Sequence, residues 1–519
     1  MINKAGRDIP DVIEGYKTVE PFAGAFESLG ERTRTTTKLK SFVPGQIKLT
    51  ESIEAVLDKV GLKDGMTISF HHHLRNGDQV VNLVTSAIAA KGIKNIHLAV
   101  SGLFAVHAPL VQLMEDGVIT KVTTSTFNPG PVAKAITAGK LQKPAVLMSH
   151  GGRPRAIESG DLHIDVAFIG APSCDEFGNM NGTGGKSACG FLSYSYADAQ
   201  YADQVVAITD TLVPYPCCPI EISQEKVDYV VKVDSIGDPK GIVSGTLTIT
   251  EDPIRLKIAA DAVKLADAAG YLKEGMSFQT GASSTALAVA AGVRDIMKER
   301  KIVGSFGLGG IHSYFVKMLE EGLFRNLFDV QGFDLEAVRS AGVNKQHMAI
   351  SGTQYANPHN KGSVVNNLDV VILGATEIDT DFNVNVITGT NGIIMGASGG
   401  HSDCAAGSKL AIIVTNLTRK NFCIVREQVT TITTPGETID AVVTNYGVAI
   451  NPRRTDLIEA AKGTDLKVLD IHELKRIGES LVGSQTNCEV TDQIVAVVEY
   501  RDGTVMDTVK KPVAEFSIF

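Results

Sequence analysis

The chain has 519 residues, of which 44% are hydrophobic and 21% charged, and a formal net charge of −9 at pH 7. This length predicts two or three domains, and the acidic balance gives no support for a nucleic-acid partner. Seven scattered cysteines argue against a disulfide framework and favour a reducing compartment. The polar N-terminus is unlike a secretory signal and no apolar run reaches the length of a membrane span, so we expect a cytoplasmic protein.

Residues 1–50 lack clean periodicity, and we interpret them as an N-terminal extension. After them, helical and strand-like patterns alternate, which predicts βαβ units and a mostly parallel sheet. The strands are short continuous apolar runs, as expected when helices cover both faces of the sheet. The predicted helices are 52–60 and 78–90, and the predicted strands are 66–70, 96–100, 145–148, 165–169 and 204–208.

Six segments of the first half recur in order in the second half, at an offset of roughly 204 to 212 residues. For example, Leu62-Lys-Asp-Gly-Met66 recurs as Leu272-Lys-Glu-Gly-Met276, and Asp175 and Asn179 recur as Asp379 and Asn383. The sequence therefore predicts two tandem α/β domains of one topology, over residues 51–250 and 251–519. Ligands of open parallel sheets bind at the carboxyl ends of strands, so the cleft between the domains is the expected site.

A glycine-rich stretch, residues 387–403, precedes the apolar run 409–414. Its backbone N–H groups could cradle an anion or an oxyanion, although a flexible surface loop fits the same pattern. The counterpart in the first half, residues 181–187, is not a P-loop, because the required glycine is Met180.

Two polar segments follow predicted strands of the first half. His71-His-His73 precedes Arg75, which could grip a carboxylate; a metal site is disfavoured because adjacent side chains point apart. His150-Gly-Gly-Arg-Pro-Arg155 could hold an anionic ligand or form a solvated turn. Cys217-Cys218, between prolines, is typical of a structural turn.

In the second half, Gln279-Thr-Gly281 ends a predicted strand, and Ser283 or Ser284 would cap the helix that follows it. The free N–H groups of that helix would make an anion site. Gly309-Gly-Ile-His-Ser-Tyr-Phe315 also follows a strand-like run and opens an amphipathic helix.

These landmarks resemble those of the coenzyme A transferases, over about residues 51–460. The resemblance rests on the tandem halves, Gln279-Thr-Gly281, Ile311-His-Ser313, Gly399-Gly-His401 and the segment 433–447. In the better-known transferases, a catalytic glutamate follows the His-Ser pair, whereas this chain has Tyr314. One branch of the family, the citrate lyase α subunits, also lacks this glutamate. Residues 150–155 and 173–179 resemble that branch as well.

The resemblance implies a citrate:acyl-carrier-protein transferase, which converts an acetyl thioester and citrate into a citryl thioester and acetate. It implies a complex with a β subunit that cleaves the citryl thioester and a γ subunit, the acyl carrier. The carrier's thiol sits on a prosthetic group derived from dephospho-CoA, which CoA can replace in assays. No metal and no tightly bound cofactor are expected.

The resemblance and the residues together give the expected site. Gly399 and Gly400 are candidate oxyanion donors, and Tyr314 touches an acyl oxygen or fills the space of the glutamate. Citrate requires cationic groups, so Arg75, Arg153 and Arg155, with His401, are the expected citrate ligands. Gly281, Ser283 and Ser284 are the expected contacts of CoA or the carrier. A small-acid or malonate transferase and a non-catalytic ligand-sensing subunit are the alternatives.

Overall fold

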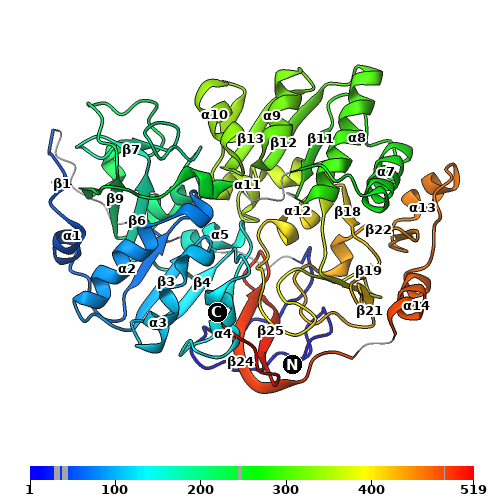
Figure 1. The fold of residues 1–519 in the computed structure, drawn as a ribbon, viewed down its shortest axis with the longest axis horizontal. Helices are drawn as coiled ribbons and strands as arrows, with labels where there is room; N and C mark the ends of the chain where they lie inside the picture. Colours follow the sequence, from blue (N-terminus) through cyan, green and yellow to red (C-terminus); the bar gives the residue numbers. More distant parts are fainter. Residues whose placement is uncertain (28–34, 38–44, 244–247, 282, 484–485, 519) are drawn as a thin grey trace.

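The computed structural model describes residues 1–27, 35–37, 45–243, 248–281, 283–483 and 486–518. The chain forms two α/β halves that lie side by side, each built on a sheet covered by helices (Figure 1). The predicted fold class, tandem α/β domains with mostly parallel sheets, is confirmed. None of the described helices is long and apolar enough to cross a lipid bilayer.

The first sheet has ten strands, and every neighbouring pair except the last is parallel. In spatial order they are β1 (Leu49–Thr50), β10 (Tyr229–Lys232), β9 (Gln204–Thr209), β6 (Val166–Ala171), β2 (Thr67–Phe70), β3 (Ile96–Val100), β4 (Ile119–Thr124), β5 (Ala145–Leu147), β24 (Val490–Glu499) and β25 (Val505–Pro512). The helices of this half are α1 (Ile53–Lys59), α2 (Val80–Ala90), α3 (Leu110–Glu115), α4 (Pro131–Thr137), α5 (Gly152–Ser159) and α6 (Tyr196–Tyr201).

The second sheet has eight strands, of which only the last pair is antiparallel. In spatial order they are β14 (His347–Ala349), β13 (Phe324–Gly332), β12 (Gly304–Ile311), β11 (Ser277–Thr280), β15 (Val370–Leu373), β18 (Leu410–Val414), β22 (Ala441–Val443) and β23 (Val448–Ile450). The helices are α7 (Pro253–Ala268), α8 (Ser284–Arg300), α9 (Ser313–Glu320), α10 (Leu335–Val343), α11 (Gly352–Ala356), α12 (His401–Gly407), α13 (Thr455–Lys462) and α14 (Ile471–Val482). Short two-residue and three-residue strands complete the loops: β7 (Ser173–Cys174), β8 (Met180–Asn181), β16 (Glu377–Asp379), β17 (Val384–Asn385), β19 (Thr418–Arg419), β20 (Phe422–Cys423) and β21 (Val425–Arg426).

The internal repeat corresponds to a repeated topology. The order β10-β9-β6-β2-β3-β4-β5 in the first sheet matches β22-β18-β15-β11-β12-β13-β14 in the second. The repeated Asp and Asn residues make the same turn in both halves: the Asn179 side chain donates to Asp175 at 2.8 Å, and that of Asn383 donates to Asp379 at 3.1 Å. The sequence repeat therefore corresponds to a repeat of both the strand order and the turns between strands.

Both faces of the second sheet are buried, which explains the continuous apolar runs in its strands. Along β18, Leu410 and Ile412 join one hydrophobic cluster, while Ala411 and Ile413 join the cluster on the opposite face. Neither face of such a strand can carry the polar residues that mark a solvent-facing side.

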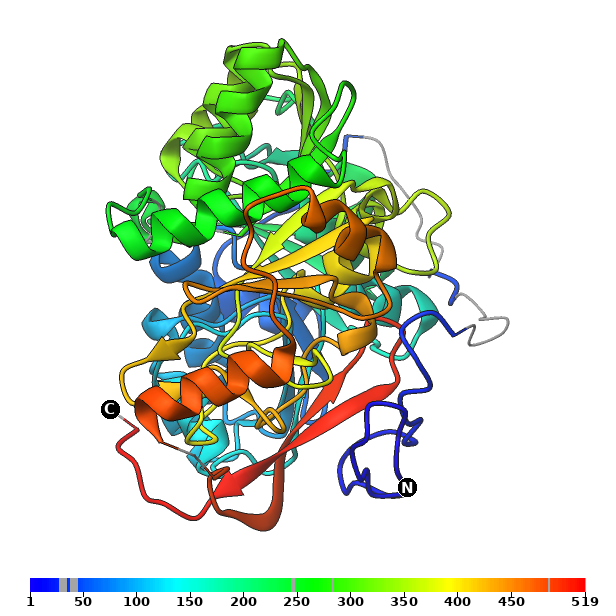
Figure 2. The ribbon, with the colours of Figure 1, turned by 90° about the vertical axis from the view of Figure 1, so that its right-hand side faces the viewer.

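The C-terminal hairpin β24–β25 belongs to the first sheet, whereas residues 490–512 were predicted to lie in the second domain. Strand β24 runs parallel to β5 and covers its edge. The N-terminal segment packs on the same hairpin, since the Asn3 side chain donates to the carbonyls of Val505 and Met506 at 3.1 and 2.9 Å (Figure 2). Local apolar alternation predicts a strand, but it carries no information on which sheet the strand joins.

Candidate active site

A cavity of about 380 Å³ lies between the two halves, at the carboxyl ends of their parallel strands. Most of its first-half residues follow β2, β4 and β5, and most of its second-half residues lie at the ends of β11, β12, β13 and β15. Short helices supply the others, which are Tyr194, Tyr355, Gly400 and His401. The lining residues are His72, Arg75, Thr126, Phe127, Asn128, His150, Tyr194, Gln279, Thr280, Gly281, Gly310, Val330, Gln331, Phe333, Tyr355, Leu373, Gly374, Gly400 and His401. The duplication thus brings two sets of strand ends to one site, as expected for parallel sheets.

Arg75 is the cation of this cavity. Its guanidinium carbon lies 5.3 Å from the ring centre of Phe104 and 4.9 Å from that of Phe333, so two aromatic faces hold it. Burial lowers the pKa of Arg75, yet a guanidinium stays charged at neutral pH. Among the described residues, no carboxylate forms an ion pair with Arg75, so its charge is available for an anionic ligand.

Two histidines and a tyrosine pack together on the first-half wall. The Tyr194 ring centre lies 5.1 Å from that of His72 and 4.8 Å from that of His150. Burial lowers the pKa of His150 to about 3 and that of His72 well below its usual range, so both rings are neutral at neutral pH. Their neighbours His71 and His73 do not line the cavity.

The two glycines expected to stabilise an oxyanion have different roles. The Gly399 N–H donates to the Ser125 carbonyl at 2.9 Å, and the Gly399 carbonyl accepts the His150 N–H at 2.7 Å. Gly399 is therefore a connection between the halves, and its N–H is not a free donor, contrary to the prediction. Gly400 lines the cavity, and within the described chain its N–H donates to no protein group. Gly400 remains the candidate oxyanion donor.

His401 lines the cavity, but the protein uses both of its ring nitrogens. Nε2 lies 2.8 Å from the Gly374 carbonyl, which can only accept, so Nε2 carries the proton. Nδ1 then accepts the Thr434 hydroxyl at 2.7 Å. Because burial lowers the pKa of His401 to about 4, the ring offers a ligand an apolar face and no charge.

Arg153 and Arg155, two of the expected citrate ligands, do not line the cavity. Arg153 makes two 2.7 Å hydrogen bonds with Asp198, and Arg155 lies 2.6 Å from Asp161 and 3.8 Å from Glu499. Both arginines are at most 2% exposed. The prediction was wrong for both positions, because a local sequence pattern does not show the acidic partners that neutralise them.

The three expected carrier contacts lie at the start of α8. Gly281 lines the cavity, and Ser283 caps the helix by accepting the Ala286 N–H at 3.2 Å, as predicted. The Ser284 hydroxyl accepts a hydrogen bond from Arg255 at 3.2 Å. Only Gly281 of the three reaches the cavity directly.

Tyr314 lies outside the cavity lining. It is half-buried on α9, packs against the core of the second half and faces Arg294 on α8. Burial raises the pKa of the Tyr314 phenol. This placement favours a packing role over contact with an acyl oxygen.

Asn128, Tyr194, Phe333 and Tyr355 also line the cavity, although none of them was predicted from the sequence. They come from loops and short helices with no recognisable motif, so no local signal could have selected them. Within the described chain, the lining includes no aspartate, glutamate, lysine or cysteine. The cavity is therefore rich in hydrogen-bond donors and has no carboxylate to act as a nucleophile.

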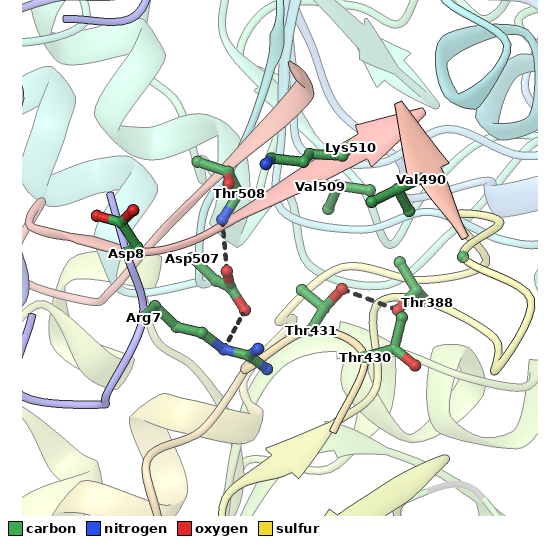
Figure 3. A pocket seen from close by; sticks show the side chains of 11 residues that line it. Arg7, Asp8, Thr388, Thr430, Thr431, Val490, Asp507, Thr508, Val509 and Lys510 are labelled. Atoms are coloured by element: carbon green, nitrogen blue, oxygen red, sulfur yellow. Dashed lines mark hydrogen bonds and ion pairs between the residues drawn. The ribbon is translucent and has the colours of Figure 1, made fainter. Parts of the chain in front are cut away.

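A second, smaller cavity of about 210 Å³ lies where the N-terminal segment meets the C-terminal hairpin (Figure 3). In its lining, Arg7 and Asp507 compensate each other, since Arg7 Nε lies 3.0 Å from the Asp507 carboxylate. The Arg7 guanidinium also donates to the Val429 carbonyl at 2.5 Å. We interpret this cavity as a structural junction.

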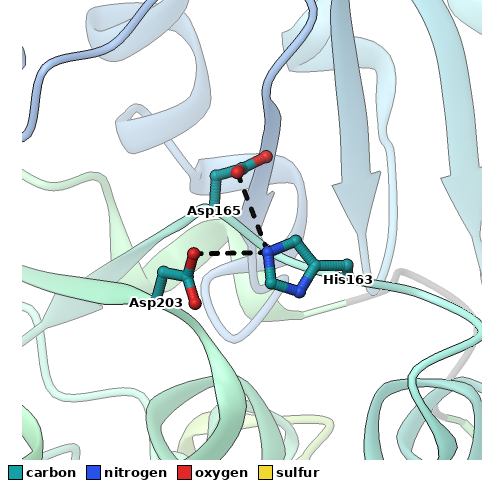
Figure 4. A group of neighbouring side chains, drawn as sticks. All are labelled: His163, Asp165 and Asp203. Carbon is teal, nitrogen blue, oxygen red and sulfur yellow. Dashed lines mark ion pairs between the residues drawn. The ribbon is translucent and has the colours of Figure 1, made fainter. Parts of the chain in front are cut away.

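His163, Asp165 and Asp203 lie together near the amino ends of β6 and β9 (Figure 4). The cavity lies at the carboxyl ends of the strands, so this group is far from it along the strands. His163 Nε2 lies 3.3 Å from Asp203 and 3.8 Å from Asp165. The Asp165 carboxylate also accepts the Thr67 N–H at 2.7 Å. These contacts are those of a partly exposed polar group, in which Asp165 connects the start of β2 to the start of β6.

Two mostly parallel sheets of repeated topology, with a shared cavity at their strand ends, are the arrangement that the resemblance to the coenzyme A transferases implies. The α subunit of malonate decarboxylase from Acinetobacter baumannii has this fold, with a TM-score of 0.61 at 13% identity over 85% of this chain and 90% of that one. The sequence model of the family "Citrate lyase, alpha subunit" matches residues 46–512.

Individual relatives agree with that match. The citrate lyase alpha chain of Klebsiella pneumoniae is 46% identical over 466 residues, which cover 90% of this chain and 92% of the relative. That of Haemophilus influenzae is 48% identical over 462 residues, which cover 89% and 92%. The crystal structure of the alpha subunit of citrate lyase from Streptococcus mutans, in complex with citrate, has a TM-score of 0.95 at 46% identity and covers 99% of this chain and 100% of that one.

The chain belongs to the family of citrate lyase alpha subunits. It is a transferase of the coenzyme A transferase type, which works with an acyl carrier in a citrate lyase complex.

Proposed function

We propose that the cavity between the halves is where citrate replaces acetate on the carrier's thioester. The observation that carries this proposal is the cavity's composition: one arginine without an acidic partner, neutral donors, and no carboxylate among the described lining residues. The positive charge of Arg75 attracts the carboxylates of a polycarboxylate, and no carboxylate of the described lining repels them. The citrate complex of the Streptococcus mutans relative supports the choice of citrate.

The same composition supports acyl transfer directly between the two substrates. A citrate carboxylate oxygen attacks the acetyl thioester carbon, and the carbon–sulfur bond breaks to give a mixed anhydride and a thiolate. The thiolate then attacks the citryl carbon of the anhydride, and acetate leaves. No side chain needs to carry the acyl group, which agrees with Tyr314 in the place of a nucleophilic glutamate and with its position outside the lining.

Both steps pass through a tetrahedral oxyanion. Gly400 offers a backbone N–H on the cavity wall, and one such donor contributes about 3–4 kcal/mol to the stability of an oxyanion. Arg75 positions citrate through its charge, held by Phe104 and Phe333. Positioning supplies much of the remaining acceleration, because the anhydride must react before water reaches it.

The thioester belongs, in this proposal, to the γ subunit of the complex, on an arm derived from dephospho-CoA. The arm enters beside Gly281 and the start of α8, and CoA thioesters replace it in assays. The citryl thioester then passes to a β subunit, which cleaves it. No tightly bound cofactor or metal takes part.

The test is acyl exchange with labelled acetyl-CoA and citrate. We expect labelled acetate and citryl-CoA in equal amounts, and no exchange into malonate or butyrate beyond a small fraction of the citrate rate. Release of labelled acetate without citryl-CoA would contradict the proposal. Comparable rates with malonate would instead favour a small-acid transferase, and no exchange with any acceptor would favour a ligand-sensing subunit.

A second experiment addresses the direct transfer. After incubation with labelled acetyl-CoA alone, borohydride or hydroxylamine treatment should leave no label or hydroxamate on any side chain. A trapped acyl or thioester adduct on the protein would overturn direct transfer and leave the overall reaction intact.

A further inference from the structure

The cavity wall holds two stacked imidazoles whose outer nitrogens are left for a ligand. The rings of His72 and His150 are 6.0 Å apart and inclined by only 14°. Each ring has its Nδ1 on a serine hydroxyl: His72 Nδ1 lies 2.6 Å from Ser101 Oγ, and His150 Nδ1 lies 3.0 Å from Ser125 Oγ. In both cases Nε2 has no partner among the described protein groups and belongs to a cavity-lining residue.

The hydrogen bonds around Ser125 determine where His150 carries its proton. The Ser125 hydroxyl lies 2.9 Å from the Ser101 carbonyl, which can only accept, so the single hydroxyl proton points to that carbonyl. His150 Nδ1 must then donate to Ser125 Oγ. The ring is neutral, so its Nε2 carries a lone pair and can only accept a hydrogen bond.

The Ser101 hydroxyl imposes the opposite arrangement on His72. Ser101 Oγ accepts the His72 backbone N–H at 3.1 Å, and its own proton has one acceptor within reach in the described chain, His72 Nδ1. Ser101 is fully buried, so a hydroxyl proton without an acceptor would be costly. The His72 proton therefore lies on Nε2, which can only donate.

The exchanged acids and the thioester group bring one matching donor to this wall. Acetate, the thioester and the three carboxylates of citrate offer only acceptors, whereas the tertiary hydroxyl of citrate can donate. Direct transfer also leaves no proton for a neutral base to take, because a carboxylate attacks and a thiolate leaves and returns. A lone pair at this position is thus suited to recognition.

We propose that His150 Nε2 accepts a hydrogen bond from the tertiary hydroxyl of citrate, while His72 Nε2 donates to one of its carboxylates. His150 then selects citrate over propane-1,2,3-tricarboxylate, the same tricarboxylate without the hydroxyl. This inference rests on the proposed function and names the group that gives it specificity.

The kinetic test compares citrate with propane-1,2,3-tricarboxylate, also called tricarballylate, as acceptors in the exchange with acetyl-CoA. We expect His150→Phe to lower the citrate-to-tricarballylate ratio of kcat/KM about 10- to 100-fold, mainly through the KM for citrate. His150→Gln, whose carbonyl oxygen can reach the Nε2 position, should restore part of that ratio. The matched control is His72→Phe, which removes a donor to a group that both acceptors share. It should slow both reactions equally.

Equal losses with both acceptors in His150→Phe, or a changed ratio in His72→Phe alone, would overturn the assignment. Calorimetric titration of citrate and tricarballylate measures the same preference in binding. If citrate binds in preference to tricarballylate but no citryl-CoA forms, the proposed function fails and the His150 assignment stands. If citryl-CoA forms and the preference is independent of His150, the assignment fails and the function stands.

A measurement on the unmodified protein avoids variants that fold poorly. Nitrogen-15 NMR of histidine-labelled protein should find His150 protonated at Nδ1 and His72 protonated at Nε2. Addition of citrate should shift the unprotonated His150 Nε2 signal more than addition of tricarballylate does. A proton on His150 Nε2 in the free protein would refute the proposal.

Discussion

Replacing Gly400 by alanine should damage the site through one atom. A Cβ on Gly400 would lie 2.4 Å from Tyr355 Oη and 3.3 Å from Tyr355 Cζ. The backbone of Gly400 accepts alanine, because its φ is −92°. Tyr355 is 2% exposed, and its hydroxyl lies 2.9 Å from Cys404 Sγ and 3.1 Å from Gln279 Nε2. Either the hydroxyl leaves these partners or the Gly400 N–H moves.

The magnitude follows from those contacts. Overpacking a close-packed interior costs about 1–3 kcal/mol, and each lost buried hydrogen bond adds about 1 kcal/mol. We therefore expect Gly400→Ala to lower the free energy of unfolding by about 2–4 kcal/mol. Displacement of the oxyanion donor should also lower kcat for citrate exchange about 10²- to 10³-fold.

Urea unfolding and acyl exchange measure the two effects, with Gly399→Ala as the matched control. Gly399 has a φ of +53°, and its nearest neighbour on the Cβ side is His150 Nε2 at 3.6 Å. Alanine there should cost only the backbone strain, about 1–2 kcal/mol. Adding Tyr355→Phe to Gly400→Ala should recover stability, because the clashing oxygen is gone. The reasoning is refuted if Gly400→Ala is as mild as its neighbour, or if Tyr355→Phe recovers nothing.

Four further substitutions test the roles of charge and of the missing glutamate. Arg75→Met should lower kcat/KM for citrate about 30- to 1,000-fold with the KM for acetyl-CoA unchanged, since a charged hydrogen-bonding anchor contributes about 2–4 kcal/mol. Arg153→Met should instead lower the free energy of unfolding by about 3–5 kcal/mol, because it leaves Asp198 buried and unpaired. Steady-state kinetics and denaturant unfolding separate the two, and a selective citrate effect of Arg153→Met would contradict the assignment. Tyr314→Phe should keep exchange activity within about threefold, whereas a thousandfold loss would mean that the phenol takes part in the reaction. Burial raises the pKa of Asp403 from 3.8 to about 6, so its contribution to stability is complete below about pH 4 and is lost as the pH rises through 6. Between pH 4 and pH 6, the free energy of unfolding of Asp403→Asn should therefore rise by about 3 kcal/mol relative to that of the natural protein. A difference in unfolding free energy that does not change with pH would refute this.

The periodicity and the repeat were enough to predict the fold class. Apolar runs such as 410–414 predict strands buried on both faces, and the recurrence of Leu62–Met66 at Leu272–Met276 marks the first strand of each repeat. The hairpin 490–512 was assigned to the other half, because a strand's partner depends on contacts that are distant in sequence. Strand identity is a local property and sheet membership is not.

The same distinction between local and long-range information applies to the predicted site residues. Arg75 and Gly281 follow strand ends at the cavity, and Gly400 and His401 reach it at the start of α12. The two arginines of α5 resemble an anion site in sequence, but acidic residues on other elements neutralise them. Motifs select residues that can bind charge, whereas the tertiary structure decides whether that charge is already used.

The C-terminal hairpin has a consequence for the order in which the protein can be completed. During synthesis, residues 51–243 leave the ribosome with the edge of β5 uncovered, because β24 is made only after the whole second half. An open strand edge is a template for pairing with other chains. The newly made first half is therefore exposed to pairing with other chains at this edge, and a peptide with the sequence of residues 490–512 should protect it in trans.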